Sequence, residues 1–499
     1  MFTFIRYISV ILSPVFLYLS LKFIDFGLLY IPFFSFIIFT ISFFKKKRKL
    51  ITFFIFFLYW LLTLFWILNL NVDLTGLQRV LLFFGWIFLS AFYAFLFSLP
   101  FFLCSLDNFE IFVIPLIYSV IEILMSLTRD FSFIWMFPSV SLVKYPILIQ
   151  TADIGGSYIL TFFVILFSVL IYKIFVDKKN FRKYFLIFLI VFLLIFYYGI
   201  YSLRKDFSNG NKKFKVTLIQ PNLEGYMKES YRDFVDYRID MIKELLDVSL
   251  KDDGDILIFP ETSSPIFFSY ESPTRRYLKN FAAANNRSIF IGAIREDEGK
   301  DLYYNSIFLF KPDGSIEHYD KIRLVPFVEH LPYSDIWDFI KKIDYGQGDY
   351  TPGKVQKVFT YKDVNFSGYI CFESIFPKFV TNFSKNGANF LINVSEDIWF
   401  IKGDGLKQHF YSGMLRSVEN RKYLVRVSNP GISAVIDWYG NIIWKSNKGK
   451  KEVKTENVGL NDRLTFFVYS DNIAGKILIY IFILFIYVKI GWRKNDGKS

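Results

Sequence analysis

Long apolar segments fill the N-terminal part of this chain, and they constrain its fold more than any other feature. A helix needs about 20 mostly apolar residues to cross roughly 30 Å of hydrocarbon. We predict eight membrane spans, near residues 5–22, 26–44, 51–70, 80–101, 109–127, 157–176, 184–203 and 473–491. The first is not read as a signal peptide, because no small-residue cleavage site follows it. The chain is 53% hydrophobic, which excludes a disordered protein.

Clusters of basic residues predict the orientation of these spans, because Lys and Arg concentrate in the cytoplasmic loops of membrane proteins. The clusters lie at 45–49, 178–183 and 493–498, after the second, sixth and eighth spans. If every span crosses, all three clusters fall on one face, which is then the cytoplasmic one. The region between the last two spans lies on the opposite, periplasmic face. Much of the net charge of +13 is therefore a topology signal, and we predict no nucleic-acid partner.

Cysteine and histidine are too few and too scattered for a cross-linked or metal-binding scaffold. The two cysteines, Cys104 and Cys371, do not make a disulfide framework. The three histidines show no His-x-x-x-His spacing, and the chain has no Cys-x-x-Cys. We therefore predict no metal and no cofactor.

From about residue 205 to 470 short apolar runs alternate with longer amphipathic ones, which is typical of a layered α/β domain. The predicted strands are Val216–Gln220, Ile256–Phe259, Ile289–Ala293, Ser306–Phe310, Asn365–Ile370, Phe390–Val394, Leu424–Val427 and Ser433–Ile436. The predicted helices are Tyr231–Leu250, Thr274–Asn285, Glu373–Lys385 and Leu406–Arg421. The turn sequence Lys-Pro-Asp-Gly at 311–314 predicts a hairpin.

Three chemically useful residues follow apolar strands of this domain. Glu261 comes directly after the strand that starts at Ile256, and open α/β sheets place their ligands at such strand ends. Lys321 lies in the segment Tyr-Asp-Lys-Ile-Arg, and Cys371 lies where a strand runs into a predicted helix. Each residue alone also fits an ordinary role, as a solvated glutamate, a surface lysine or an inert buried cysteine.

Taken together, the three residues predict catalysis by a thiol nucleophile. A thiol needs a base to take its proton, and a carboxylate can serve in a poorly solvated site. A nearby lysine can stabilise the oxyanion of a tetrahedral intermediate. We also expect the helix after Cys371 to stabilise its thiolate through the helix dipole and the unpaired N–H groups. No histidine belongs to the set, so the pattern is not a Cys-His dyad.

The segments around these residues resemble the Glu-Lys-Cys motifs of the nitrilase, or carbon–nitrogen hydrolase, superfamily. They read Phe-Pro-Glu-Thr at 259–262, Asp-Lys-Ile-Arg-Leu-Val-Pro-Phe at 320–327 and Gly-Tyr-Ile-Cys-Phe-Glu at 368–373. Further matches are Gln-Pro-Asn at 220–222, Phe327-x-Glu329-x-x-Pro332, Asn393-x-Ser-x-Asp397-x-Trp399-Phe400, Gln408-His409 and Asn429-x-Gly431. The membrane frame is similar to one branch, the apolipoprotein N-acyltransferases, and the resemblance covers essentially the whole chain.

The resemblance implies a fold and a set of site residues. The fold is a polytopic α-helical membrane domain of about eight transmembrane helices, joined to a nitrilase-like α/β domain built as an αββα sandwich. Glu261 is implied as the general base, Lys321 as the oxyanion stabiliser and Cys371 as the nucleophile. Glu329 matches a second family glutamate that supports the lysine and the intermediate, and Glu373 matches an acidic position of this branch.

Three residues depart from the family pattern. Phe372 replaces a common tyrosine, Val328 replaces a usual glycine, and Glu396 replaces a usual asparagine. None of them belongs to the Glu-Lys-Cys set, so they bear on substrate fit more than on chemistry.

The resemblance also implies a two-step acyl transfer, the last step of bacterial lipoprotein maturation. Cys371 takes an acyl chain from a membrane phospholipid as a thioester, and the α-amino group of a diacylglyceryl-cysteine apolipoprotein then takes it as an amide. The expected setting is the bacterial inner membrane. We divide the chain into an N-terminal membrane domain at 1–204, a periplasmic catalytic domain at 205–470, and a C-terminal transmembrane helix with a cytoplasmic tail at 471–499.

Two other functions stay open on the sequence alone. A membrane-tethered nitrilase-type amidase would keep the triad and use water as the acceptor, although seven helices are many for a tether. A non-enzymatic transporter or receptor would place ionisable residues inside its spans, and the predicted spans are nearly free of them in their middles. Aromatic loops near 264–270, 333–350 and 398–401 either dip into the membrane interface or fill a seam between the domains.

Overall fold

The first part of the computed structural model is a bundle of long apolar helices. The structure describes residues 2–71, 74–107, 109–128, 132–210, 213–222, 231–264, 272–297, 299–333 and 350–496. The long helices are α1 (Phe2–Lys22), α2 (Tyr30–Ser42), α3 (Arg48–Thr63), α4 (Gly76–Leu103), α5 (Ile114–Leu127), α7 (Ala152–Val176), α8 (Phe181–Arg204) and α14 (Ile473–Asp496). Short helices α6 (Pro146–Ile149) and α13 (Phe466–Tyr469) accompany them.

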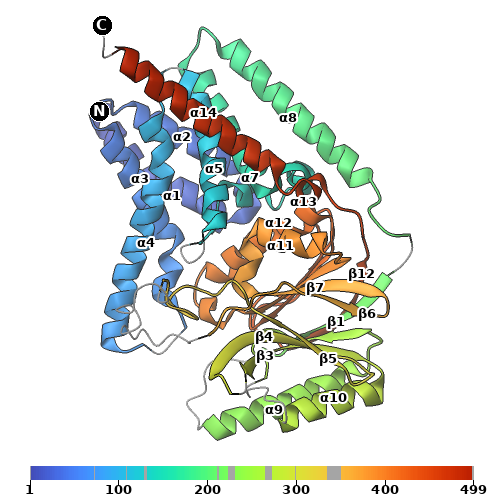
Figure 1. The fold of residues 1–499 in the computed structure, drawn as a ribbon. Helices are drawn as coiled ribbons and strands as arrows, with labels where there is room; N and C mark the ends of the chain where they lie inside the picture. Colours follow the sequence, from blue (N-terminus) through green and yellow to red (C-terminus); the bar gives the residue numbers. More distant parts are fainter. Residues whose placement is uncertain are drawn as a thin grey trace.

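Seven segments within the described residues are long and apolar enough to cross a membrane. They coincide with the second to eighth predicted spans, and the first predicted span lies in α1. The chain is therefore a multi-pass membrane protein. In Figure 1 α1 begins and α14 ends at the same end of the bundle, away from the strands.

Helix α7 is broken near its start, at Gly156, and the residues at the break contact α12 and α13. Gly156 has a φ of +68°, a conformation that glycine adopts without steric cost. A Cβ there would lie 2.6 Å from the ring of Phe467 in α13. Because the helix restarts after the break, the backbone N–H of Ser157 is free to donate to the Glu419 carboxylate at 2.8 Å.

The second part contains two six-stranded sheets. The first sheet has the order β12 (Glu452–Gly459), β1 (Lys213–Gln220), β2 (Ile256–Ile258), β3 (Ser288–Asp297), β4 (Leu302–Phe310) and β5 (Ile316–Asp320). The second has the order β11 (Ile442–Lys445), β10 (Ala434–Ile436), β9 (Leu424–Asn429), β8 (Phe390–Glu396), β7 (Val364–Ile370) and β6 (Val358–Tyr361). In each sheet the three central strands, β1–β2–β3 and β7–β8–β9, are parallel, and the outer pairings are antiparallel.

The sheets and four helices form an αββα sandwich (Figure 1). Helices α9 (Tyr231–Ser249) and α10 (Pro273–Asn285) cover the first sheet on the side away from the membrane helices. Helices α11 (Pro377–Lys385) and α12 (Gly405–Asn420) lie between the second sheet and the bundle. One continuous apolar core runs from the bundle to the space between the sheets, and a separate core lies under α9 and α10.

The predicted fold class is confirmed, and all eight predicted strands are present. The hairpin at 311–314 joins β4 to β5, with the Gly314 N–H donating to the Lys311 carbonyl at 3.0 Å. One predicted helix, Glu373–Lys385, is wrong at its start. Residues Cys371–Ile375 form a 3₁₀ turn, and α11 begins only at Pro377, because a residue before proline is kept out of the helical region.

The three aromatic loops have different outcomes. Nearly all of 264–270 and of 333–350 lies outside the described residues. In the third loop, Phe400 packs against Trp66 and Trp135 of the membrane part, with ring centroids 5.0 and 6.1 Å away. That loop therefore fills the seam between the two parts.

Candidate active site

Two glutamates and one lysine meet at the end of the first sheet. Glu261 follows β2, and Lys321 follows β5. The Lys321 ammonium donates to Glu261 Oε1 at 3.1 Å and to Glu329 Oε1 at 2.9 Å. Asn305, on β4, donates through Nδ2 to the same two oxygens at 2.7 and 2.9 Å. A cation and an amide therefore bridge two carboxylates that water barely reaches, since Glu261 is 4% and Glu329 8% exposed.

The lysine of this cluster is held in its charged form. Burial alone would lower the pKa of Lys321, but the carboxylates of Glu261 and Glu329 outweigh burial and raise the pKa well above its usual value. A permanently charged ammonium can stabilise negative charge on a reacting oxygen without itself losing a proton.

The second oxygen of Glu261 is held by the other sheet. The backbone N–H of Glu396, at the end of β8, donates to Glu261 Oε2 at 2.7 Å. The Glu396 side chain accepts two bonds from Asn429 Nδ2, at 3.1 and 3.2 Å. Burial, reinforced by the nearby Glu261 charge and opposed by Arg238 and Asn429, raises the pKa of Glu396 to about 8. The family departure at this position thus adds a further buried carboxyl with a raised pKa beside Glu261.

Cys371 lies across from this cluster, at the end of β7. Its φ is +48°, a left-handed conformation that costs a non-glycine residue about 1–2 kcal/mol. Burial raises the pKa of the thiol well above its usual value, the Glu261 charge adds to the rise, and the Lys321 charge opposes it. The expectation of a thiolate stabilised by a helix dipole is therefore wrong. The residue starts a single 3₁₀ turn, and its proton must be removed by a base when the sulfur reacts.

Glu373 joins the cysteine turn to the lysine loop. Its Oε1 accepts bonds from the Tyr319 hydroxyl at 2.7 Å and from the backbone N–H groups of Ile322 and Arg323 at 2.7 and 3.0 Å. Its Oε2 accepts from the backbone N–H of Ile370 at 2.7 Å. Four donors on one fully buried carboxyl fix the segments on either side of the reacting groups relative to each other. Burial raises the pKa of Glu373 to about 7 against the effect of these bonds.

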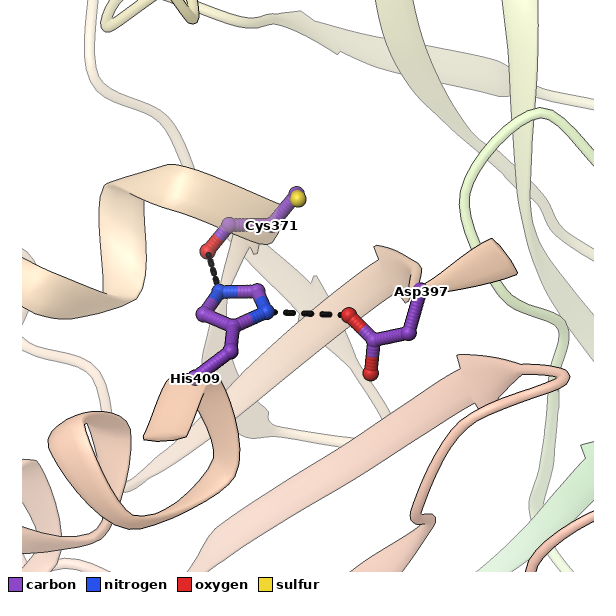
Figure 2. Close-up of side chains that lie close together, drawn as sticks. All are labelled: Cys371, Asp397 and His409. Carbon is purple, nitrogen blue, oxygen red and sulfur yellow. Dashed lines mark hydrogen bonds and ion pairs between the residues drawn. The ribbon is translucent and has the colours of Figure 1, made fainter. Parts of the chain in front are cut away.

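A buried histidine and aspartate lie behind the cysteine (Figure 2). His409 Nδ1 lies 2.9 Å from Asp397 Oδ1, and His409 Nε2 lies 3.3 Å from the carbonyl oxygen of Cys371. Figure 2 shows the Cys371 sulfur pointing away from the imidazole ring. The three side chains bring potential metal-ligand atoms within 4.8 Å of one another. Because Asp397 Oδ2 already accepts a bond from Arg426 at 2.8 Å and the ring nitrogens face protein partners, the group does not resemble an open metal site.

The membrane part also contributes to the wall of the site. Phe133, in the segment after α5, stacks on Phe372 with centroids 6.1 Å apart and on Trp135 at 5.0 Å. Arg323 of the lysine loop donates to the carbonyl of Thr128 at 2.9 Å. The departure at Phe372 therefore places an apolar ring against aromatic side chains of the bundle, where a tyrosine would add a hydroxyl.

Two family models match the chain in succession. The Apolipoprotein N-acyltransferase N-terminal domain matches residues 14–170, and Carbon-nitrogen hydrolase matches residues 216–463. Together the two ranges cover most of the chain, in the order that the bundle and the sandwich follow. The chain belongs to the apolipoprotein N-acyltransferase family.

Curated members of the family align with more than half of this chain. The apolipoprotein N-acyltransferase of Geobacter metallireducens is 30% identical over 330 residues, which are 64% of this chain and 63% of that protein. The one from Aquifex aeolicus is 29% identical over 361 residues, 72% of this chain and 78% of that protein. A solved CN-hydrolase superfamily protein from Xanthomonas campestris aligns with 50% of this chain and 91% of its own, at 19% identity and a TM-score of 0.38.

The structure brings the residues singled out by the family motifs into one place. Glu261, Lys321 and Glu329 share hydrogen bonds, and the charges of Glu261 and Lys321 act on the Cys371 thiol. Glu373 accepts a bond from the backbone N–H of Ile370, the residue before Cys371. Sequence reasoning missed Asn305, which bridges the carboxylates from the middle of a strand. A buried amide in a strand made mostly of apolar and aromatic residues, Leu-Tyr-Tyr-Asn-Ser-Ile-Phe-Leu-Phe, was the available signal.

Proposed function

We propose that this protein transfers an acyl chain from a membrane phospholipid to the α-amino group of a diacylglyceryl-cysteine apolipoprotein, with Cys371 as the covalent carrier. The observation that carries the proposal is the buried thiol beside a lysine bridged to two carboxylates, in a chain with both parts of the apolipoprotein N-acyltransferase family. The phospholipid, the apolipoprotein and the bilayer are the proposed partners.

In the first half-reaction Cys371 Sγ attacks the ester carbonyl carbon while Glu261 takes the thiol proton. The tetrahedral oxyanion is stabilised by the Lys321 ammonium, which stays protonated throughout. The intermediate collapses by breaking the C–O bond, and Glu261 returns the proton to the departing alkoxide, so that a lysophospholipid leaves. The product on the enzyme is a thioester.

In the second half-reaction the lipoprotein amine attacks the thioester carbonyl carbon, and Glu261 accepts a proton from the nitrogen. A second oxyanion forms next to Lys321. Its collapse breaks the C–S bond, and the proton held by Glu261 passes to the leaving sulfur. The amide and the free thiol result, so the enzyme returns to its starting state, as ping-pong kinetics require.

The position of the site beside the bundle suits lipid substrates. Each CH₂ drawn from an apolar environment into water costs about 0.8 kcal/mol, so chemistry at the bilayer surface keeps the acyl chains out of water. We further propose that the sandwich faces the periplasm. A periplasmic reporter fused after Asn209 and a cytoplasmic reporter fused after Ser499 are both expected to be active, and activity of one reporter type at both positions would overturn this orientation.

A trapping experiment tests the mechanism. The purified protein in detergent is incubated with a phospholipid that carries a labelled acyl chain, and the labelled peptide is identified after digestion. We expect a label on the Cys371 peptide that neutral hydroxylamine removes, and transfer of that label to a diacylated lipopeptide. Transfer without any trapped thioester, or release of free fatty acid as the only product, would contradict the proposal.

A further inference from the structure

The strained turn that carries Cys371 is held from behind by His409. The His409 ring nitrogen Nε2 lies 3.3 Å from the carbonyl oxygen of Cys371 and 3.3 Å from the hydroxyl of Ser374, two groups of the same 3₁₀ turn. A left-handed cysteine persists only when its surroundings determine its conformation. The imidazole contacts both ends of the turn, so it is placed to do this.

His409 can hydrogen-bond the Cys371–Ile375 turn whether its imidazole ring is neutral or protonated. The Asp397 carboxylate can only accept, so Nδ1 carries a hydrogen toward Oδ1 at 2.9 Å, and Arg426 Nη2, which also lies 3.2 Å from Nδ1, donates to Asp397 Oδ2. Burial and the Arg426 charge lower the pKa of His409, which favours the neutral ring. In that state Nε2 accepts from the Ser374 hydroxyl. In the protonated state Nε2 donates to the Cys371 carbonyl instead, so the turn is tied to His409 either way.

The ring itself is fixed by both parts of the molecule. Asp397 is anchored by Arg426 at 2.8 Å and by the Ser428 hydroxyl at 2.6 Å. On its face the ring stacks against Trp135 of the membrane part, with centroids 5.7 Å apart and an interplanar angle of 20°. Trp135 Nε1 donates to Gln408, the preceding residue of α12, at 2.5 Å. The His409 ring is thus held by a hydrogen bond to Asp397, at the end of β8, and by stacking on Trp135 of the membrane part.

We propose that His409 is a positioning residue of the acyl transfer, which holds the Cys371–Ile375 turn in the conformation from which the sulfur attacks. The stack on Trp135 extends this support to the membrane part. The inference rests on the proposed role of Cys371 as the nucleophile. We do not assign His409 as the base, because Nδ1 faces Asp397 and Nε2 faces the Ser374 hydroxyl and the Cys371 carbonyl rather than the Cys371 sulfur (Figure 2).

The test compares two replacements of His409 that differ in one property. His409→Phe keeps a ring between Asp397 and Trp135 but removes both nitrogens, whereas His409→Gln keeps an amide that reaches toward Ser374. Thioester formation from labelled phospholipid is measured per reactive thiol, counted by titration with a small alkylating reagent. We expect His409→Phe to slow this rate by about 10²-fold with an unchanged KM for phospholipid, because small misplacements of a reacting group have effects of that size. We expect His409→Gln to recover the rate to within about tenfold of wild type, because its amide restores the contact that positions the turn.

Ser374→Ala supplies an independent arm, because it removes the hydroxyl partner and leaves the ring in place. The double variant Ser374→Ala, His409→Phe is expected to be no slower than His409→Phe alone, as for two residues in one interaction. Phe410→Leu, at the next position of α12, is the stability control, and it should lower the melting temperature without slowing the rate per thiol.

The outcomes separate the two levels of the proposal. No thioester in the wild-type protein would overturn the proposed function itself. A wild-type thioester with an unchanged rate per thiol in His409→Phe would overturn the positioning role alone. A loss of reactive thiol in His409→Phe and His409→Gln alike, with a normal rate for the remainder, would assign His409 to folding only and also overturn it.

Discussion

The two halves of the candidate site are built in different ways. The acid–base half consists of Glu261, Lys321, Glu329 and Asn305, which come mainly from the first sheet and satisfy one another through bonds of 2.7–3.1 Å. The nucleophile half is a single strained cysteine on the second sheet. Its supports are a histidine behind it, a carboxyl beneath it and aromatic rings that belong to the membrane bundle.

The first half of the site is held together by ion pairs, whereas the second half is held together by packing and hydrogen bonds around the cysteine. In the acid–base half the ion pairs with Glu261 and Glu329 keep Lys321 charged, and these pairs need no contact with the membrane part. The geometry of the nucleophile half depends on packing that crosses the seam to the membrane part. We therefore expect changes in the first half to alter proton transfer and folding stability, and changes in the second half to alter the rate of attack.

The largest effect is expected from removing the nucleophile. Cys371→Ala should abolish both the trapped thioester and the transfer, because it removes the thiol that carries the acyl chain in the proposed mechanism. Cys104→Ser is the matched control, since Cys104 is also buried but lies at the end of α4. It should leave turnover within a few-fold, and a loss comparable to that of Cys371→Ala would mean that the nucleophile is misassigned.

Lys321→Met should have the next largest effect and should act on both rate and stability. Losing an oxyanion donor typically slows a reaction by about 10²–10³-fold. Removing the cation also leaves two buried carboxylates uncompensated, and breaking a buried pair costs about 3–5 kcal/mol. Adding Glu329→Gln should restore part of the melting temperature but none of the rate. Recovery of activity in that double variant would show that Lys321 has only a structural role.

A smaller effect is expected from Phe133→Ala, which removes the stack of the membrane part on Phe372. We expect thioester formation to slow by roughly tenfold, because misplacing a reacting group by a fraction of an ångström has effects of this order. The pH profile should stay unchanged, since the acid–base half is untouched. Phe133→Leu is the control that keeps most of the volume. A shifted pH profile in Phe133→Ala would break the separation between the two halves.

The smallest effect is expected from Glu396→Gln and should be visible mainly in stability. The pKa of Glu396 is about 8 in the folded protein against an ordinary value of 4.5, so the wild type loses stability as pH rises from about 4.5 to 8. The glutamine cannot ionise and still offers an acceptor to Asn429. The melting temperature of the variant relative to wild type should therefore increase by a few degrees over that interval and level off above it. A constant difference across the interval would contradict the raised pKa.

The length of the apolar segments and the alternation of short apolar runs with amphipathic ones predicted a membrane domain joined to a layered α/β domain, and the family resemblance supplied the αββα sandwich. The eight predicted strands are the buried ones with continuous apolar runs. The hairpin prediction at 311–314 implied β5 without giving its bounds, and β6, β11 and β12 were missed. All four are edge strands of their sheets, and a sequence such as Glu-Val-Lys-Thr-Glu-Asn in β12 carries no apolar run. Their pairing comes from neighbouring strands, which a single segment does not encode.

For the site, the strand-end rule located Glu261 and Cys371, and the family resemblance supplied Glu329 and Glu373. The sequence could not predict the charge state of the cysteine, because the expected helix was a 3₁₀ turn and burial dominated its pKa. The contact of His409 with the nucleophile was equally inaccessible. It joins residues 38 positions apart through a backbone carbonyl, which has no sequence signature.

The two helix layers of the sandwich differ in how much of their surface is exposed, and this difference decides whether the sandwich can be produced as a separate fragment. Helices α9 and α10 expose much of their outer face, whereas nearly every residue of α12 is buried, on one side by the second sheet and on the other by the bundle. A fragment that begins near residue 205 would expose to water the face of α12 that now packs against the bundle. It would also expose the Arg421 guanidinium, which pairs with Asp153 of α7 at 2.7 Å in the full chain. We therefore expect the sandwich expressed on its own to aggregate. Activity is best measured on the full chain, with all its helices, in detergent or lipid.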